Sequence, residues 1–519
     1  PEGAARRVQQ SIDRGLERER QPARPIGGVS RTRFINPPPG AVPSHFQDRD
    51  DETRLLGTFL EDDAKRLITV VGRAGMGKTA VVCRLLKALE SGTLPDGETP
   101  LPVDGIVYLS ETGSYRVNVA NLFASLCRLL PDDVVRELDA VYKNPQASAE
   151  QKMQALLAAF PRGRVVVLMD NFEDLVDSDT FDILDDELDE ALRALLHLPH
   201  HAVKVILTTR VRPRSLNLFQ PGRQAPLFLD EGLPSPYAEN ILRAMDADGK
   251  VGLQTAPDAL LDEARERTNG NPRALEALFA ILAADRDTTL PEILSATQAL
   301  LPETVTEALV GEAFSRLDAA AQRIMQALAV YGHPVSPVAV DYLLQPHLPG
   351  VDGAPVLSRL VNRQFARKEK GLYYLHPVDR AYALSRIPKG DALDRFAEEE
   401  SPFTQFALFH RGANYFEQAR KPREEWKSVD DLAPQLAEFD LRCAGQDYDT
   451  AASVLLGIDF DYLLLWGHVR LMAQLHERLS DRLNDPSLKS RSVGNLGTAY
   501  RSMGQIEKAV NCYEQALAI

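Results

Sequence analysis

Hydrophobic residues in the first half of the chain form short continuous runs separated by longer stretches of mixed character. The runs are rich in apolar and β-branched residues and mostly lack alternation with polar ones: 67–71, 106–109, 165–169, 203–207 and 227–229. Strands that are buried on both faces show this pattern, and they are typical of parallel sheets with helices between the strands. The pattern therefore predicts an α/β domain over residues 46–232.

After residue 233 the hydrophobic spacing becomes helical. Ser235-Pro236 predicts a helix start, with the serine as N-cap and the proline as the first helical residue, and a small helical domain over 233–301. Residues 302–390 then predict a helix through 314–330 and shorter helices. A hairpin follows that turns at Gly371 and leads into the strand-like 372–375. Helices that end in such a hairpin predict a winged-helix domain.

The C-terminal part has the pattern of helices only, including 449–456 and 462–483. We expect a helical region similar to tetratricopeptide repeats (TPRs) over 391–486 and the start of a TPR array over 487–519. Small, aromatic and leucine residues follow the spacing of that repeat at Leu496, Gly497, Tyr500, Ala509, Tyr513 and Ala516. A single repeat cannot bury its own faces, so we expect further repeats after Ile519.

The first 45 residues predict a linker. They are Arg-rich, with a short polar helix expected over 6–20 and a stiff Pro-rich stretch over 36–40. The chain starts at Pro1 rather than at a methionine. We therefore expect a fragment whose linker follows a missing N-terminal effector domain.

Composition narrows the class of protein. A length of 519 residues predicts several domains, and 44% hydrophobic with 26% charged residues is ordinary for globular proteins. The apolar runs are too short to span a bilayer, so we expect no membrane segment. A net charge of −15 argues against a general nucleic-acid-binding surface. The cysteines form no metal or disulfide pattern, which fits a reducing cytoplasm: Cys83, Cys127, Cys443 and Cys512.

The segment Gly72–Thr79 reads GRAGMGKT and fits the P-loop pattern GxxxxGK[ST] in full. It follows the predicted strand 67–71 and opens a predicted helix, which is the context that the motif requires. Its backbone N–H groups converge on phosphates, Lys78 neutralises β/γ oxygens and the Thr79 hydroxyl ligates Mg²⁺. The predicted ligand is ATP or ADP with Mg²⁺. The predicted phosphate-binding residues are Gly72, Gly75, Met76, Gly77, Lys78, Thr79 and Ala80.

Asp170 follows the buried run 165–169 and is predicted to hold Mg²⁺ together with Thr79, as the Walker B carboxylate. Many P-loop ATPases place a glutamate next, but this chain has Asn171, which cannot act as a general base. Glu173 and Asp174 are the nearest acids; either can replace that base or be only a solvated loop residue. The sequence therefore predicts slow hydrolysis, with Asp170 and Glu173 as the candidate catalytic residues.

Arg210 follows the run 203–207 and two threonines. An arginine at the end of a strand beside the phosphates can contact the γ-phosphate and so distinguish ATP from ADP. We expect Arg210 to line the nucleotide site.

These residues, in this order, resemble the STAND class of P-loop ATPases, the NB-ARC/NLR-like switch proteins of immunity and their bacterial relatives. The resemblance covers residue 46 to the end of the chain. Segment 165–175 (VVVLMDNFEDL) is close to the bacterial form of the Walker B segment in this class, and 207–210 (LTTR) matches its sensor arginine.

The resemblance also implies roles for residues distant from the P-loop. Phe46, Gln47 and Arg49 occupy the place of the entry motif that touches adenine, although its usual glycine is absent. Pro272, within Gly-Asn-Pro, matches the proline that packs on the base. His376, within LHPVD, occupies the histidine position of the MHD motif, where it is implied to reach the β-phosphate of ADP.

The resemblance implies a signalling switch in which the nucleotide controls how the winged helix docks. An unknown protein or small molecule would bind the C-terminal repeats, and activation would produce a homo-oligomer that clusters an N-terminal effector. Bacterial antiphage or stress defence is the implied setting, and a TIR-type NAD-cleaving domain is a frequent effector.

Two alternatives remain open. A STAND-type transcriptional regulator is supported locally by the basic residues near the wing, Arg363, Arg367, Lys368 and Lys370. The net acidity makes DNA binding the less favoured interpretation. A chaperone-like or motor ATPase conflicts with Asn171.

Overall fold

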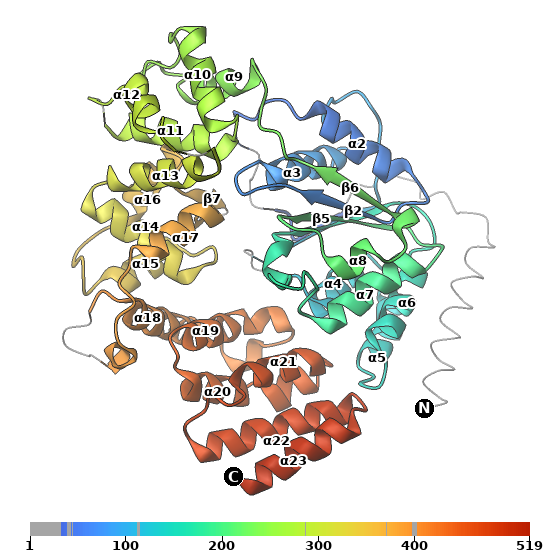
Figure 1. Ribbon diagram of the computed structural model, residues 1–519. Coiled ribbons are helices and arrows are strands. Elements are labelled where there is room, and N and C mark those ends of the chain that lie inside the picture. Colours follow the sequence, from blue (N-terminus) through green and yellow to red (C-terminus); the bar gives the residue numbers. More distant parts are fainter. Residues whose placement is uncertain are drawn as a thin grey trace.

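The computed structural model describes residues 33–38, 43, 45–111, 115–285, 287–300, 302–369, 371–396 and 402–519. The expected linker helix over 6–20 lies outside the described residues, as does Lys370. A sheet with helices on both sides occupies one part of the molecule, and helical layers occupy the rest (Figure 1).

The sheet has six parallel strands in the order β1-β3-β4-β5-β2-β6. All the hydrophobic runs that predicted strands are strands of this sheet: β2 (Leu67–Val71), β3 (Gly105–Ser110), β4 (Val165–Asp170), β5 (Val203–Thr209) and β6 (Gln224–Phe228). The first strand, β1 (Arg33–Ile35), lies within the segment predicted as a linker and pairs with β3 at the sheet edge. The prediction of a linker throughout this segment is therefore wrong.

The strands lack alternation because both faces of the sheet are covered. In β4, Val166 and Leu168 belong to the core under α2 (Asp50–Glu61) and α3 (Lys78–Leu89). Val165, Val167 and Met169 belong to the core on the other face. That face is covered by α4 (Val119–Cys127), α5 (Asp132–Tyr142), α6 (Ala149–Ala158), α7 (Asp186–His197) and the short α8 (Arg214–Asn217). The predicted α/β fold is confirmed.

A helical group follows the sheet, made of α9 (Tyr237–Met245), α10 (Asp258–Thr268), α11 (Pro272–Ala284) and α12 (Leu290–Ala296). Helix α9 begins at Tyr237, and Pro236 is its N-cap residue without a side-chain cap. The prediction of Ser235 as N-cap is wrong by one residue. The backbone N–H groups of Tyr237 and Ala238 both donate to the Pro234 carbonyl, which forms a turn before the helix begins.

The next group has the arrangement of a winged helix. It contains α13 (Pro302–Ser315), α14 (Ala319–Tyr331), α15 (Pro337–Leu344), α16 (Gly353–Asn362), the hairpin β7 (Arg367–Glu369) and β8 (Leu372–Tyr374), and α17 (Pro377–Ser385). The predicted single helix through 314–330 is wrong. Asp318 accepts a hydrogen bond from the Ala321 N–H at 2.8 Å and caps a new helix there.

The remaining part is helical, with α18 (Gln405–Gln418), α19 (Ala433–Ala444), α20 (Tyr448–Leu456), α21 (Val469–Leu479), α22 (Pro486–Ser502) and α23 (Ile506–Ala518). The helix predicted over 462–483 is shorter, because Gly467, with φ of 85°, separates α21 from a π-helical turn at Asp459–Leu464. Helices α22 and α23 pack closely at Gly497, where a Cβ would lie 2.9 Å from the Tyr513 ring. A small residue is needed there, as the repeat spacing predicted.

The C-terminal helices contact the helices that cover the sheet. The Tyr142 hydroxyl lies 3.1 Å from Nδ1 of His468, and Arg470 pairs with Glu187 at 3.1 Å. The first contact joins the residue before α21 to α5, and the second joins the first turn of α21 to α7 (Figure 1). Among the described residues, no helix combines the length and apolarity needed to cross a bilayer.

Candidate functional site

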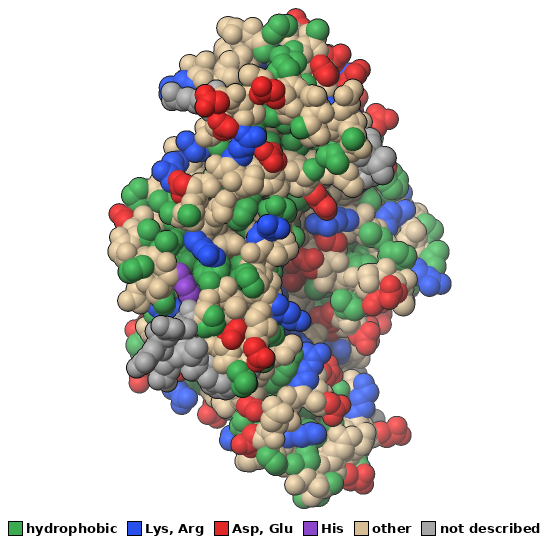
Figure 2. Space-filling model, turned by 60° about the vertical axis from the view of Figure 1, so that its left-hand side comes forward, with side chains coloured by type: hydrophobic (Ala, Val, Ile, Leu, Met, Phe, Trp, Pro, Cys, Tyr) green, Lys and Arg blue, Asp and Glu red, His purple; other side chains and the backbone are tan. Residues whose placement is uncertain are grey.

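A cavity of about 500 Å³ lies where the carboxyl ends of β2, β4 and β5 face α11 and the winged helix. The surface is visibly hollowed between the sheet domain and the helical layers, with acidic and basic side chains around the hollow (Figure 2). The cavity is lined by nearly all residues that the sequence predicted for the site: Phe46, Gln47, Arg49, Gly75, Met76, Gly77, Lys78, Thr79, Ala80, Asp170, Glu173, Arg210, Pro272 and His376. Gly72 does not line it; a Cβ there would lie 2.7 Å from the Leu229 carbonyl oxygen.

The P-loop joins β2 to α3. Gly75 and Gly77 have φ values of 81° and 87°, a backbone conformation that glycine adopts without strain. Lys78 donates to the carbonyl oxygens of Gly72 at 2.8 Å and Arg73 at 3.1 Å. Burial lowers the pKa of Lys78 from its usual value. The ammonium group is therefore held at the loop, where a phosphate can compete for its hydrogen bonds.

Thr79 and Asp170 are in contact beside the P-loop, where the strands of the sheet end. The Thr79 hydroxyl donates to Oδ1 of Asp170 at 2.7 Å, and the Tyr108 hydroxyl donates to Oδ2 at 3.1 Å. Thr208 also donates to Asp170. Burial raises the pKa of Asp170, while these hydrogen bonds act in the opposite direction. The convergent hydroxyl and carboxylate oxygens fit Mg²⁺, which when bound neutralises charge on the phosphates.

The predicted base and the predicted sensor arginine contact each other. Nε of Arg210 donates to Oε1 of Glu173 at 3.0 Å, and the Arg210 side chain is 46% exposed. Glu173 Oε2 is buried without a hydrogen-bond partner in the described part of the chain. Asn171 has φ of 56° and directs its amide to Oδ2 of Asp170 at 3.3 Å. A glutamate at this position would adopt that backbone conformation less easily.

The entry segment forms an apolar end of the cavity with Phe46 and Pro272. The Arg84 guanidinium lies 4.8 Å from the centre of the Phe46 ring, on which it stacks. Arg49 is buried and donates to Glu52 at 2.7 Å and to the Glu231 carbonyl at 3.1 Å. These bonds hold Arg49 against the polypeptide at the margin of the cavity.

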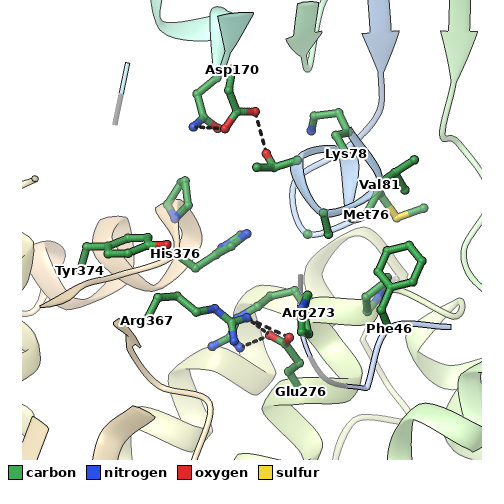
Figure 3. A pocket seen from close by; sticks show the side chains of 18 of the residues that line it. Phe46, Met76, Lys78, Val81, Asp170, Arg273, Glu276, Arg367, Tyr374 and His376 are labelled. Carbon is green, nitrogen blue, oxygen red and sulfur yellow. Dashed lines mark hydrogen bonds and ion pairs between the residues drawn. The ribbon is translucent and has the colours of Figure 1, made fainter. Parts of the chain in front are cut away.

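His376 lies across the cavity from Lys78 (Figure 3). Its Nδ1 accepts a hydrogen bond from the Val378 N–H at 3.3 Å, so the ring caps the start of α17. Burial, together with the positive charges of nearby Arg273 and Arg367, lowers the pKa of His376 to about 3. The imidazole is therefore neutral, and because Nδ1 accepts, Nε2 carries the proton that it can donate to a phosphate.

An ion-pair cluster forms the wall beside His376 (Figure 3). Glu276 accepts from Arg273 at 2.6 Å and from Arg367 at 2.7 and 2.8 Å, and His45 lies 3.3 Å away. Arg273 also donates to Asp379 at 2.5 Å. Burial acts to raise the pKa of Glu276, but Arg367, His45 and Arg273 outweigh it and hold that pKa well below its usual value. The cluster connects the entry segment, α11, β7 and α17.

The sequence prediction missed this cluster. Arg273 and Glu276 lie one turn apart on α11, where they read as ordinary helix residues. In the sequence, Arg367 reads only as one of the basic residues near the wing. The signal in the sequence is an arginine directly after Pro272 in an otherwise mostly apolar helix, and the structure shows that Arg273 is buried, with 3% exposure.

The start of α11 contacts the P-loop directly. The Asn271 side chain accepts from the N–H groups of Arg273 and Ala274, and its amide donates to the Ala74 carbonyl at 3.2 Å. The Arg273 N–H donates to the Gly75 carbonyl at 3.3 Å. The phosphate-binding loop is thus hydrogen-bonded to the helical group that follows the sheet.

Comparison with known proteins agrees with this arrangement. Residues 61–211 match the family model described as an AAA domain. A crystal structure from Pyrococcus horikoshii, a Signal Transduction ATPase with Numerous Domains (STAND) with a tetratricopeptide repeat sensor, superposes over 95% of this chain. Its TM-score is 0.52 at 15% sequence identity. The chain has the fold of a STAND-class P-loop ATPase. It spans 66% of the length of that structure.

The STAND fold accounts for the order of the parts from the P-loop sheet to the C-terminal helices. A curated relative, an uncharacterized WD repeat-containing protein of Nostoc sp., is 21% identical over 360 residues. That match covers 66% of this chain and 26% of the relative, so the chain spans about a quarter of that protein's length.

Proposed function

We propose that the chain is a signalling switch whose state is set by ATP or ADP bound with Mg²⁺ in the cavity at the P-loop. The observation that carries the proposal is that Lys78, on the sheet domain, and His376, on the winged helix, line the same cavity. A nucleotide there contacts both parts, so its affinity depends on how they dock.

The charges around the cavity support different contacts for the two nucleotides. Arg210 lies at the sheet edge, where it would contact a γ-phosphate in exchange for Glu173. His376 would donate from Nε2 to the β-phosphate of ADP when the winged helix is docked. ADP then favours the docked arrangement, whereas the additional contact that ATP makes with Arg210 on the sheet domain does not depend on docking.

Slow hydrolysis suits such a switch, because the bound nucleotide then defines a long-lived state. Asn171 cannot accept a proton and so cannot act as the general base that many P-loop ATPases have at this position. The chain is thus proposed to be a weak ATPase, with Asp170 and Thr79 as the ligands of Mg²⁺.

The partners and setting also belong to the proposal. The C-terminal helices would bind an activating protein or small molecule, and the contacts of His468 and Arg470 with the sheet domain would link that event to the nucleotide site. Undocking would allow self-association and clustering of an effector, in the manner of bacterial defence proteins. DNA reading by the wing is not proposed, because Arg367 pairs with Glu276 inside the protein.

Nucleotide titration tests the proposal. Wild type is expected to bind ADP and ATP with different affinities, and Lys78→Ala is expected to lose both, because the phosphates lose their fixed cation. Lys87→Ala, an exposed lysine on the same helix, is the matched control and should bind as wild type does. Retained nucleotide affinity in Lys78→Ala with an unchanged unfolding temperature would contradict the proposal.

A further inference from the structure

Arg273 is the residue of α11 that contacts both the P-loop and the winged helix. Its backbone N–H donates to the Gly75 carbonyl at 3.3 Å. Its guanidinium donates to Asp379 on α17 at 2.5 Å and to the Gln364 carbonyl, just before β7, at 3.1 Å. A Cβ at Gly75 would lie 2.6 Å from the Arg273 Cβ, so loop and helix pack without space between them.

Breaking the ion pair between Arg273 and Asp379 costs much free energy, because both side chains are buried. Arg273 is 3% exposed and Asp379 is 2% exposed on their side chains. Removing one partner of a buried ion pair leaves the other charge unsolvated, which is far more costly than losing a surface pair. Movement of the winged helix away from α11 would separate Arg273 from Asp379 and Gln364. That movement would leave the backbone bond between Arg273 and Gly75 in place.

We propose that Arg273 is a positioning residue that couples the P-loop to the docking of the winged helix. The proposal rests on the nucleotide switch described above and adds the connection between its two parts. The P-loop and the start of α11 move together, because Asn271 and Arg273 bond to Ala74 and Gly75. A shift of the loop on phosphate binding is therefore transmitted through the Arg273 side chain to Asp379, three residues after His376.

Arg273→Met tests this role, because it keeps the backbone contact with Gly75 and removes the side-chain contacts with α17. The readout is the ratio of ADP to ATP affinity, measured by titration with Mg²⁺. We expect ADP affinity to fall relative to ATP by about 10-fold, within the roughly 5- to 150-fold range of allosteric couplings. Arg273→Lys keeps the charge with fewer donors, so its shift should be smaller and in the same direction.

Arg442→Met is the matched control. Arg442 is equally buried on α19 and lies near the carboxylates of Glu438 and Asp447, but it is remote from the cavity lining. The Arg442→Met substitution should lower the unfolding temperature and leave the ratio of ADP to ATP affinity unchanged.

A double variant tests whether Arg273 acts through Asp379. In Arg273→Met/Asp379→Asn, the affinity ratio should shift no further than in Arg273→Met alone, because the two residues act as a pair.

Two results would overturn the inference. An affinity ratio unchanged in both Arg273 variants, with unfolding temperatures reduced as in Arg442→Met, would make Arg273 a purely structural residue and leave the nucleotide switch intact. A wild-type chain that binds neither nucleotide, or binds both equally, would refute the switch itself and this inference with it.

Discussion

Arg210 holds Glu173 through a hydrogen bond of 3.0 Å between Nε and Oε1, at the edge of the nucleotide cavity. The arginine that we propose to sense a γ-phosphate is therefore bound to the acid that we propose to activate water. Contact of Arg210 with a phosphate would release Glu173, so the two functions are linked by one ion pair. The Arg210 side chain is half-exposed, so separating the pair costs little free energy.

Hydrolysis should be slow, well below the ~10 s⁻¹ median for enzymes, because Asn171 cannot act as a general base. Replacing Glu173 with Gln should lower the remaining turnover by about 10²- to 10⁴-fold, the usual contribution of a general base. Asp174→Asn is the control, and it should hydrolyse as wild type does. Steady-state phosphate release measures all three proteins. Turnover at ordinary enzyme rates would contradict the slow switch, and normal activity of Glu173→Gln would exclude Glu173 as the base.

The contact between α22 and α23 gives a prediction about the repeat-like end of the chain. Gly497→Ala should destabilise this helix pair by about 1–3 kcal/mol, because the new Cβ would meet the Tyr513 ring and Cys512. Gly494→Ala, on the same helix, has its nearest neighbour 3.9 Å away and should gain about 0.5–1 kcal/mol of helix stability. Thermal unfolding distinguishes the two variants. Equal effects would show that the helices are not packed as described.

The contact between His468 and Tyr142 predicts a dependence on pH. Burial lowers the pKa of His468 to about 4, below the ~6.5 of an unfolded chain. The stability contributed by the neutral ring is complete above ~6.5 and is lost as pH falls toward 4. His468→Phe keeps an aromatic ring beside Tyr142 and removes the titrating group.

Between pH 7 and pH 5, wild type should therefore lose about 2 kcal/mol more stability than His468→Phe. Carboxylates present in both proteins cancel in this difference. Denaturant unfolding at the two pH values measures it. A constant difference, or one that grows in favour of wild type at pH 5, would show that His468 does not titrate as its burial implies.

The sequence predicted the parts of the fold that depend on local pattern. The buried runs of the sheet and the P-loop follow from periodicity and a specific motif, and the structure confirms them. The strand β1 was missed because three residues in an Arg- and Pro-rich segment give no periodic signal. The break before α14 was missed because the apolar spacing continues across it, although Asp318 is a good N-cap residue.

The site was predicted less completely than the fold. Residues from the P-loop, Walker B and sensor segments lie together, as the parallel topology requires. The ion pairs of Arg273 and Glu276 with Asp379 and Arg367 join segments about a hundred residues apart. No spacing in a single sequence encodes such a contact, because it forms only when the helical group and the winged helix pack together.

We propose that His376 holds ADP when the winged helix is docked, and a variant that tests this role must keep the cap of α17. His376→Asn retains a side-chain acceptor for the Val378 N–H, but its shorter side chain cannot place a donor where Nε2 of the histidine lies, whereas His376→Ala loses both groups. A hydrogen bond to a charged group contributes roughly 1.5–3 kcal/mol.

The most direct measurement is the affinity of wild type and His376→Asn for ADP and for ATP, with particle size followed by light scattering. We expect His376→Asn to bind ADP about 10- to 100-fold more weakly, to bind ATP as wild type does and to form larger assemblies with ATP. Identical ADP affinities and identical size distributions for the two proteins would show that His376 does not hold ADP.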